Sequence, residues 1–185
     1  MNDPTAFTLR RATRADVAAI AALIARSARG LAVGDYSAAQ VEAALLGTFG
    51  LDTQLVDDGG CFVAESGGEL VGCGGWSGRR TLFGGDAGTA RDARPLDPAR
   101  NAARIRAFFV DPRHARRGIG SALLERCERE ARAAGFTAFE LMATLPGVRL
   151  YEARGYRAGA PLEHALAPGL TIRFVPMRRE ADGPR

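Results

Sequence analysis

The residues best suited to chemistry lie in one segment, residues 108–124, which reads FFVDPRHARRGIGSALL. A β-like run leads into a turn, and the turn leads into a helical pattern. Gly118 and Gly120 lack Cβ atoms, so a ligand can approach the main chain closely there. The first N–H groups of a helix have no intrahelical partners, and together with the helix dipole they attract an anion. Arg116 and Arg117 add positive charge, so the segment predicts a pyrophosphate site.

Other phosphate-binding motifs fit this segment poorly. The chain has no Gly-Lys-Ser/Thr, which a P-loop requires. A dinucleotide-binding fingerprint needs a third glycine where Leu123 stands, and it should follow an early strand. A Gly-x-Gly pair alone also fits a tight turn without a ligand, so this motif needs support from the rest of the chain.

The elements that hold this segment follow from hydrophobic periodicity and turn residues. Thr13 with Asp16, and Ser37 with Gln40, mark helix starts, and Gly67-Gly68 predicts a hairpin turn. Strands are expected at 7–10, 61–64, 70–76, 105–110, 136–142, 156–160 and 170–177, and helices at 13–24, 37–46, 118–134 and 146–153.

This order predicts an α/β (α+β) fold. The strand–helix–strand unit over 105–142 implies a parallel pair, and the hairpin implies antiparallel neighbours. We therefore expect a mixed, mostly antiparallel, twisted sheet of about seven strands with four helices. The length of 185 residues fits one domain (1–185) with a core over 7–178, a loop insertion at 79–102 and a frayed tail at 180–185.

Composition excludes several classes of protein. The net charge is +4, but the arginines are interleaved with acidic residues along the chain, so no nucleic-acid partner is predicted. No signal peptide and no apolar run of about 18 residues is evident, which predicts no membrane partner and a cytoplasmic location. Cys61, Cys73 and Cys127 show no metal-ligand spacing, and we expect neither a disulfide nor a bound metal.

Two blocks of the sequence resemble the GNAT acetyltransferase superfamily. The first runs from Val110-Asp111-Pro112 through Arg116-Arg117-Gly118-Ile119-Gly120-Ser121-Ala122-Leu123-Leu124, and it is similar to the acetyl-CoA motif of that superfamily. The second, Leu150-Tyr151-Glu152-Ala153-Arg154-Gly155-Tyr156, resembles its Leu-Tyr-Glu-x-x-Gly-Phe block. Ala115 departs from the glutamine or arginine that usually opens the first motif, which affects one contact because the motif works mainly through main-chain N–H groups.

The resemblance implies acetyl-CoA as co-substrate and a central parallel strand pair that is splayed to receive it. The backbone of Phe108, Phe109 and Val110 would then bond the pantetheine arm, and an N–H group could polarise the thioester carbonyl. The diphosphate would be held by the N–H groups of Arg116, Arg117, Gly118, Ile119, Gly120 and Ser121.

The resemblance also implies catalytic roles. Tyr151 is our candidate for the general acid that protonates the leaving thiolate, because a phenol of pKa about 10 is protonated at neutral pH; it could instead only pack over the cofactor. For the base, Glu140 on the neighbouring strand is a candidate, and a chain of water molecules is the leading alternative. His114 and His164 are more typical of surface histidines.

The resemblance implies an N-acetyltransferase in which a primary amine attacks acetyl-CoA directly within a ternary complex. Tyr36, Trp76 and the 79–102 loop are the candidates for acceptor binding, although tryptophan is more often a core residue. A homodimer is one assembly that the superfamily implies. The alternatives are an acyl-CoA-binding sensor or regulatory module without turnover and a basic nucleic-acid adaptor, which would bind with steep salt dependence.

Overall fold

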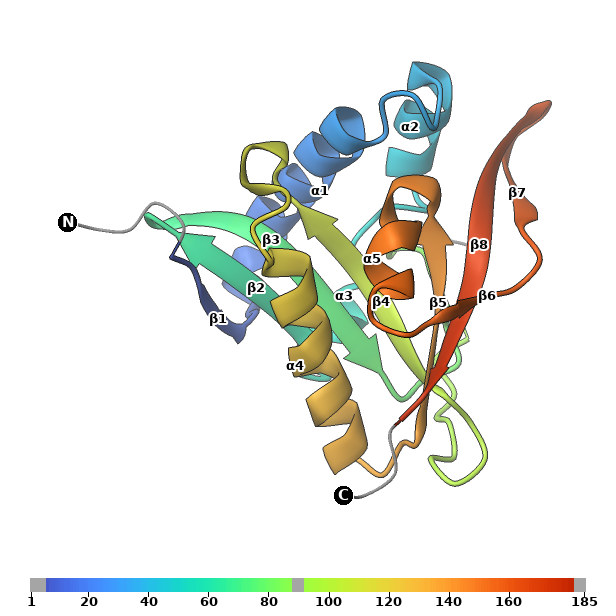
Figure 1. The fold of residues 1–185 in the computed structure, drawn as a ribbon. Helices are drawn as coiled ribbons and strands as arrows, with labels where there is room; N and C mark the ends of the chain where they lie inside the picture. Colours follow the sequence, from blue (N-terminus) through green and yellow to red (C-terminus); the bar gives the residue numbers. More distant parts are fainter. Residues whose placement is uncertain (1–5, 88–91, 182–185) are drawn as a thin grey trace.

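The computed structural model describes residues 6–87 and 92–181, which form a mixed sheet with helices on both faces (Figure 1). The sheet has eight strands in the order β1-β2-β3-β4-β5-β8-β6, and β7 pairs with β8 beside β6. The β4–β5 pair is parallel and the other pairs are antiparallel, so the predicted mixed, mostly antiparallel α/β fold is confirmed.

The strands are β1 (Thr8–Arg11), β2 (Cys61–Ser66), β3 (Glu69–Ser77), β4 (Ala103–Val110), β5 (Ala138–Thr144), β6 (Arg157–Ala158), β7 (Leu162–Ala167) and β8 (Leu170–Glu180). The α-helices are α1 (Val17–Leu31), α2 (Ala38–Leu45), α3 (Thr53–Asp57), α4 (Ile119–Ala133) and α5 (Val148–Glu152). Short 3-10 helices cover Arg14–Asp16, Pro112–His114 and Leu145–Gly147.

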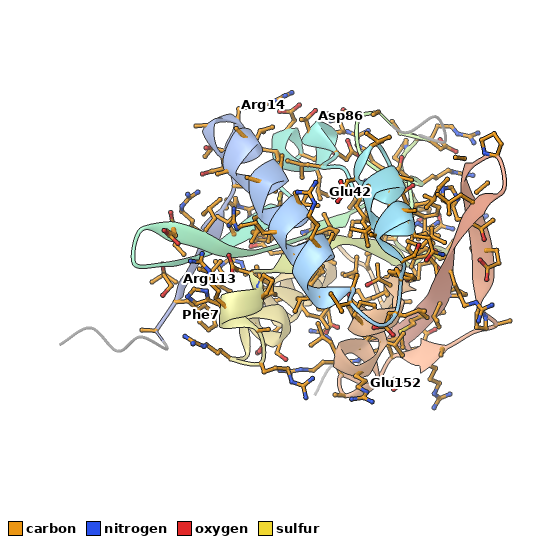
Figure 2. All side chains as sticks on the ribbon, turned by 90° about the horizontal axis from the view of Figure 1, so that it is seen from above. Phe7, Arg14, Glu42, Asp86, Arg113 and Glu152 are labelled. Atoms are coloured by element: carbon orange, nitrogen blue, oxygen red, sulfur yellow. The ribbon has the colours of Figure 1, made fainter. Side chains whose placement is uncertain are left out.

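Two hydrophobic cores lie on the two faces of the sheet. One core packs α4 and Tyr151 of α5 against the sheet, and the other packs α1, α2 and α3 against the opposite face. Figure 2 shows the same division from above, with Glu42 of α2 and Glu152 of α5 on opposite sides. Each helix therefore buries an apolar stripe while its polar face stays in water.

Helix α4 lies close to β3 because β3 carries a glycine at the contact. A Cβ atom at Gly72 would meet the Ile119 side chain at 2.5 Å, and Leu123 would be 3.3 Å away. Glycine at this position therefore fixes how near the start of α4 can come to the sheet, which positions the turn that precedes the helix.

Strands β4 and β5 pair only at their beginnings, where Ala103 lies beside Phe139 and Arg104 beside Glu140. Beyond these residues the two strands separate (Figure 1). A β-bulge in β4 accompanies the separation: Ala107 has a φ of 57°, and Ala107 and Phe108 together stand opposite Gly74 of β3. Beyond the bulge, β4 still pairs with β3 but no longer forms a ladder with β5.

Two elements were not predicted from the sequence. The five-residue helix α3 is too short to show a period, although Asp52 caps it by accepting from the N–H of Gln54. Strand β7 lies between the strands expected at 156–160 and 170–177, where no strand was expected because its residues have weak β-propensity. The sheet also extends further than expected, because β8 includes Glu180 and the N–H of Ala181 donates to Thr137. The rest of the expected tail, 182–185, lies outside the described residues.

The predicted 79–102 loop contains no regular helix or strand in its described parts, 79–87 and 92–102. Its two halves are held together by an isolated bridge between Arg79 and Pro95 and by hydrogen bonds from Thr81 to the carbonyl of Asp92. Across 6–87 and 92–181, no helix is both long and apolar enough to cross a membrane.

We expect Leu123→Ala to lower the free energy of unfolding by about 2–5 kcal/mol, because Leu123 is fully buried between α4 and β3 and its truncation leaves a cavity. Urea unfolding followed by circular dichroism measures this loss. Leu46→Ala is the control, since Leu46 is 80% exposed and its truncation should change stability by less than about 0.5 kcal/mol. Equal effects of the two substitutions would contradict the packing described here.

Candidate active site

The separation of β4 from β5 opens into a cavity of about 640 Å³. Its walls come from α1, the end of β4, the turn before α4, the first turn of α4, and the segment from Thr144 through α5. Phe108, Phe109 and Val110 line it, as do His114, Ala115, Arg116, Gly118, Ile119, Gly120 and Ser121. One end of the cavity is therefore a strand edge, and the other is a helix N-terminus.

The turn before α4 is anchored by the buried carboxylate of Asp111. This carboxylate accepts from the backbone N–H of Arg113 at 2.9 Å, from the Arg113 guanidinium at 3.1 Å, and from Arg26 of α1 at 3.1 Å. The guanidinium of Arg113, followed by the other hydrogen bonds, holds the pKa of Asp111 well below its ordinary value. The turn is thus tied both to itself and to α1.

Two residues of this turn adopt left-handed backbone conformations, Arg116 with a φ of 64° and Gly118 with a φ of 83°. Gly118 is the N-cap of α4, where glycine adopts this conformation without strain. Left-handed residues close to a helix start can turn successive N–H groups toward one point, forming a cradle for an anion. The positive end of the α4 dipole adds to the attraction.

Most of the predicted cofactor-binding residues line this larger cavity. The exception is Arg117, which is exposed and does not line it. Ser121 lines the cavity, and its hydroxyl accepts from Arg154 at 3.3 Å. The N–H of Val110 donates to the hydroxyl of Ser27 on α1 at 3.2 Å, so a polar group of α1 already meets the freed edge of β4.

Tyr151 lines both this cavity and a smaller one described below, and it is 7% exposed. Its ring packs edge-on against Phe108, with centroids 6.2 Å apart, and against Tyr156 at 5.7 Å. Burial raises the pKa of the Tyr151 phenol above its ordinary value, so the hydroxyl is protonated at neutral pH. Tyr156 is fixed in turn, because its hydroxyl donates to the buried carboxylate of Glu128 at 2.9 Å.

A second, smaller cavity of about 70 Å³ lies against the same strands. Five residues line both cavities and form their common wall: Phe49, Phe108, Phe109, Thr144 and Tyr151. The remaining walls of the smaller cavity are mostly apolar, with Leu55, Leu82, Phe83, Leu141, Met142 and Phe174 among them. A ligand in each cavity would meet the other at Tyr151 and at the bulged part of β4.

The 79–102 loop supplies part of the smaller cavity through Leu82, Phe83 and Gly84. It is held to the segment before α3, since Gly85 donates to the carbonyl of Gly47 at 2.9 Å and the Asp86 carboxylate accepts from the N–H of Thr53 at 3.0 Å. The loop therefore forms a fixed wall in the described part of the chain.

The predicted acceptor-binding residues lie in different places. Tyr36 lines the larger cavity, where its hydroxyl donates to the carbonyl of Arg173 at 2.6 Å and accepts from the N–H of Leu145 at 2.9 Å. Burial raises the pKa of Tyr36 to about 12. Trp76 lines neither cavity and packs edge-on against Phe136, with ring centroids 6.1 Å apart. Trp76 is thus partly buried and packs against the hydrophobic core on the α4 side of the sheet.

Glu140, the candidate base, also lines neither cavity. It forms ion pairs with Arg104 of β4 and, at 3.6 Å, with Arg178 of β8. Its position explains this: Glu140 lies beside Arg104 before the strands separate, so its carboxylate pairs with arginines of the adjacent strands. The structure does not bring Glu140 together with Tyr151.

Sequence reasoning missed one whole wall of the larger cavity. That wall is a stripe of mostly small residues on α1: Ser27, Ala28, Leu31 and Ala32. It also missed Arg149 and Gly147 near the start of α5. The clustering of serine and alanine on one face of α1 was the available signal, but it did not indicate which strand that face approaches.

Cysteine thiols and clusters of metal-ligand side chains are the other groups that could carry chemistry. Cys61, Cys73 and Cys127 are buried and line neither cavity, and burial raises the pKa of each thiol, to about 12 for Cys61. No group of three or more His, Cys, Asp or Glu residues that could hold a metal ion occurs in the described ranges.

The fold combines a parallel strand pair that separates with a cavity that has a helix N-terminus among its walls. The chain belongs to the acetyltransferase (GNAT) family, whose sequence model matches residues 35–156. Membership supports acetyl transfer as its general chemistry. No curated protein matches the chain significantly in sequence.

Solved structures share the whole fold at low sequence identity. A GCN5-related N-acetyltransferase of Rhodopseudomonas palustris is 21% identical with a TM-score of 0.68, covering 97% of each chain. PaiA N-acetyltransferase from Thermoplasma acidophilum, solved with coenzyme A, is 13% identical with a TM-score of 0.63, over 95% of this chain and 99% of that one. YncA from Salmonella typhimurium, with its cofactor acetyl-CoA, is 21% identical with a TM-score of 0.61, over 97% and 96%.

We expect Asp111→Asn to lower the free energy of unfolding by about 1–3 kcal/mol at pH 7, because a buried carboxylate with charged partners is lost. The pKa of Asp111 is lower in the folded state than its unfolded value of about 3.9. The ionised Asp111 carboxylate therefore contributes its full stabilisation to the folded state above about pH 4. This stabilisation is lost as the pH falls through the pKa of the folded state.

Urea unfolding at pH 7, 5 and 3 tests this expectation, with the difference between wild type and Asp111→Asn narrowing at pH 3. Asp35→Asn is the control, because Asp35 is exposed. A difference that stays constant or grows with acid would show that Asp111 does not anchor the turn through its charge.

Proposed function

We propose that this chain is an N-acetyltransferase that transfers acetyl from acetyl-CoA to a primary amine by direct attack within a ternary complex. The observation that carries the proposal is the common wall of the two cavities at Phe108, Phe109 and Tyr151. Two ligands bound side by side would bring an amine and a thioester to the same point, and orientation of this kind supplies much of an enzyme's rate.

The larger cavity suits coenzyme A in shape and in charge. Its helix end would hold the diphosphate through the N–H groups around Gly118 and Gly120, with Arg116 and Arg149 beside it. The strand end would bond the pantetheine amides through the main chain of Phe108 to Val110. The N–H of Val110 donates to the hydroxyl of Ser27, so a pantetheine amide would share this N–H with Ser27 or replace it as the acceptor.

Direct attack fits the side chains at the common wall better than an acyl-enzyme does. The three cysteines lie outside both cavities, and their raised pKa values disfavour a nucleophilic thiolate. The attacking amine must be neutral, and the apolar walls of the smaller cavity would lower its pKa by desolvation. Water would then carry the released proton to solvent.

Tyr151 would protonate the leaving thiolate. A thiol has a pKa of about 8.5, well below that of this buried phenol, so full transfer is uphill and a hydrogen bond to the departing sulfur carries much of the effect. The same hydroxyl would be equally suited to hold a thioester in a binding module without turnover. The second cavity beside it favours an enzyme, because a sensor needs no place for an acceptor.

We expect Gly120→Val to weaken coenzyme A affinity by about tenfold or more, because a side chain at Gly120 projects toward Leu150 and into the larger cavity. Isothermal titration calorimetry measures the dissociation constant. Ala133→Val, on an exposed position of the same helix, is the control for helix propensity and should bind as wild type does. Unchanged affinity in Gly120→Val would place coenzyme A elsewhere.

We expect Tyr151→Phe to lower kcat for thiol release by about 100-fold while coenzyme A affinity stays near the wild-type value, because only the acid is removed. Tyr156→Phe is the matched control: it loses the hydrogen bond to Glu128 and some stability, but it keeps the Tyr151 hydroxyl. Turnover of Tyr151→Phe at the wild-type rate, measured with acetyl-CoA and an accepted amine, would refute the acid role.

A further inference from the structure

One cation lies inside the wall of the smaller cavity. Arg106 of β4 has a side chain that is 4% exposed, and it lines this cavity with Asp52. Its Nη1 donates to Asp52 Oδ2 at 2.8 Å, and its Nη2 donates to the carbonyl of Gly84 at 2.7 Å. The guanidinium is therefore held rigidly between β4, the α3 cap and the 79–102 loop.

The third nitrogen of this guanidinium is not satisfied. The Nε of Arg106 is buried and has no hydrogen-bond partner among the described residues. Buried N–H groups are nearly always paired, and leaving one unpaired costs stability. Trp76 and Arg104 also have a buried nitrogen without a hydrogen-bond partner but line neither cavity, and His114, whose Nδ1 is likewise without one, lines only the larger cavity.

Asp52, the ion-pair partner of Arg106, already accepts hydrogen bonds from two groups of the protein. Asp52 accepts from Arg106 and from the N–H of Gln54, where it caps α3. No other carboxylate is among the described residues that line the smaller cavity, and the surrounding walls are largely aromatic and aliphatic. Besides the Arg106–Asp52 ion pair, the hydroxyl groups of Thr48, Thr144 and Tyr151 line this cavity, and the buried donor left without a partner among its walls is the Nε of Arg106.

We propose that the acceptor is a compact amino acid, and that Arg106 binds its carboxylate. The proposal rests on the function proposed above and specifies the substrate class for that site. A carboxylate would supply the acceptor oxygen that Nε lacks, and a guanidinium binds carboxylates through charge-assisted hydrogen bonds. The cavity of about 70 Å³ suits a compact molecule, with its apolar side chain among the phenylalanines. A polyamine would instead bring a second cation beside Arg106.

The proposal predicts a preference between matched compounds. Each amino acid of a panel is compared with the amine that lacks its carboxylate, and spermidine is included, with thiol release from acetyl-CoA as the readout. For the best pair we expect kcat/KM to favour the amino acid by about 100-fold, because the analogue leaves the buried donor unpaired. Decarboxylated amines or spermidine that react as well as amino acids would overturn the proposal.

Arg106→Lys tests the residue itself. Lysine keeps the charge and can pair with Asp52, but it lacks the Nε N–H and the planar guanidinium. We therefore expect the kcat/KM ratio of amino acid to decarboxylated amine to fall about tenfold, mainly because KM for the amino acid rises. Arg104→Lys is the matched control, because Arg104 is on the same strand and pairs with Glu140 outside the cavities. An unchanged preference in Arg106→Lys would remove Arg106 from acceptor binding.

The failure of this proposal can be told from the failure of the proposed function. Calorimetric titration of each amino acid, and of the amine that lacks its carboxylate, into the wild-type complex with coenzyme A compares their dissociation constants. This measurement tests the carboxylate contact without any turnover and without a variant. Tight binding of amino acids with no thiol release would refute the acetyltransferase while supporting the Arg106 site. Thiol release without carboxylate preference would refute only the Arg106 site.

Discussion

The interaction on which the site depends is the pairing between β4 and β5, because it stops after two residues. Beyond Arg104 the strands separate, and the left-handed Ala107 turns the end of β4 away from the regular ladder. Main-chain groups freed inside a sheet are costly unless something bonds them. Ser27 meets the N–H of Val110, and a ligand with amides of its own, such as pantetheine, can pair with the rest.

The same separation sets the positions of the remaining parts. Because β4 leads directly into the Asp111 turn, the bulge also determines where the N-terminus of α4 points, and Gly72 lets that helix approach the sheet. Tyr151 lines the same cavity, supported by Tyr156 and the buried carboxylate of Glu128. The turn before α4, the end of β4 and the Tyr151 phenol therefore line one cavity and depend on one another for their positions.

The sequence predicted most of this arrangement, since periodicity, glycines and caps are local signals. Apart from α3 and β7, it predicted the order of the helices and strands, the parallel pair and the turn that leads into α4. It could not show that Glu140 lies where β4 and β5 are still paired, because the end of pairing depends on the bulge at Ala107, a non-glycine residue in a left-handed conformation. The α1 wall and Arg106 were missed for a related reason: they reach the cavities only through tertiary packing.

The two cavities differ in how their chemistry is encoded, and this difference bears on specificity. In the proposed function the coenzyme A side would rely largely on main-chain groups, so Ala115 would leave the proposed diphosphate site intact. The proposed acceptor side would rely on side chains, on Arg106 above all, and on a loop held in place by Gly85 and Asp86. Substitutions in that loop or at Arg106 would therefore change which amine is accepted and leave the cofactor site intact.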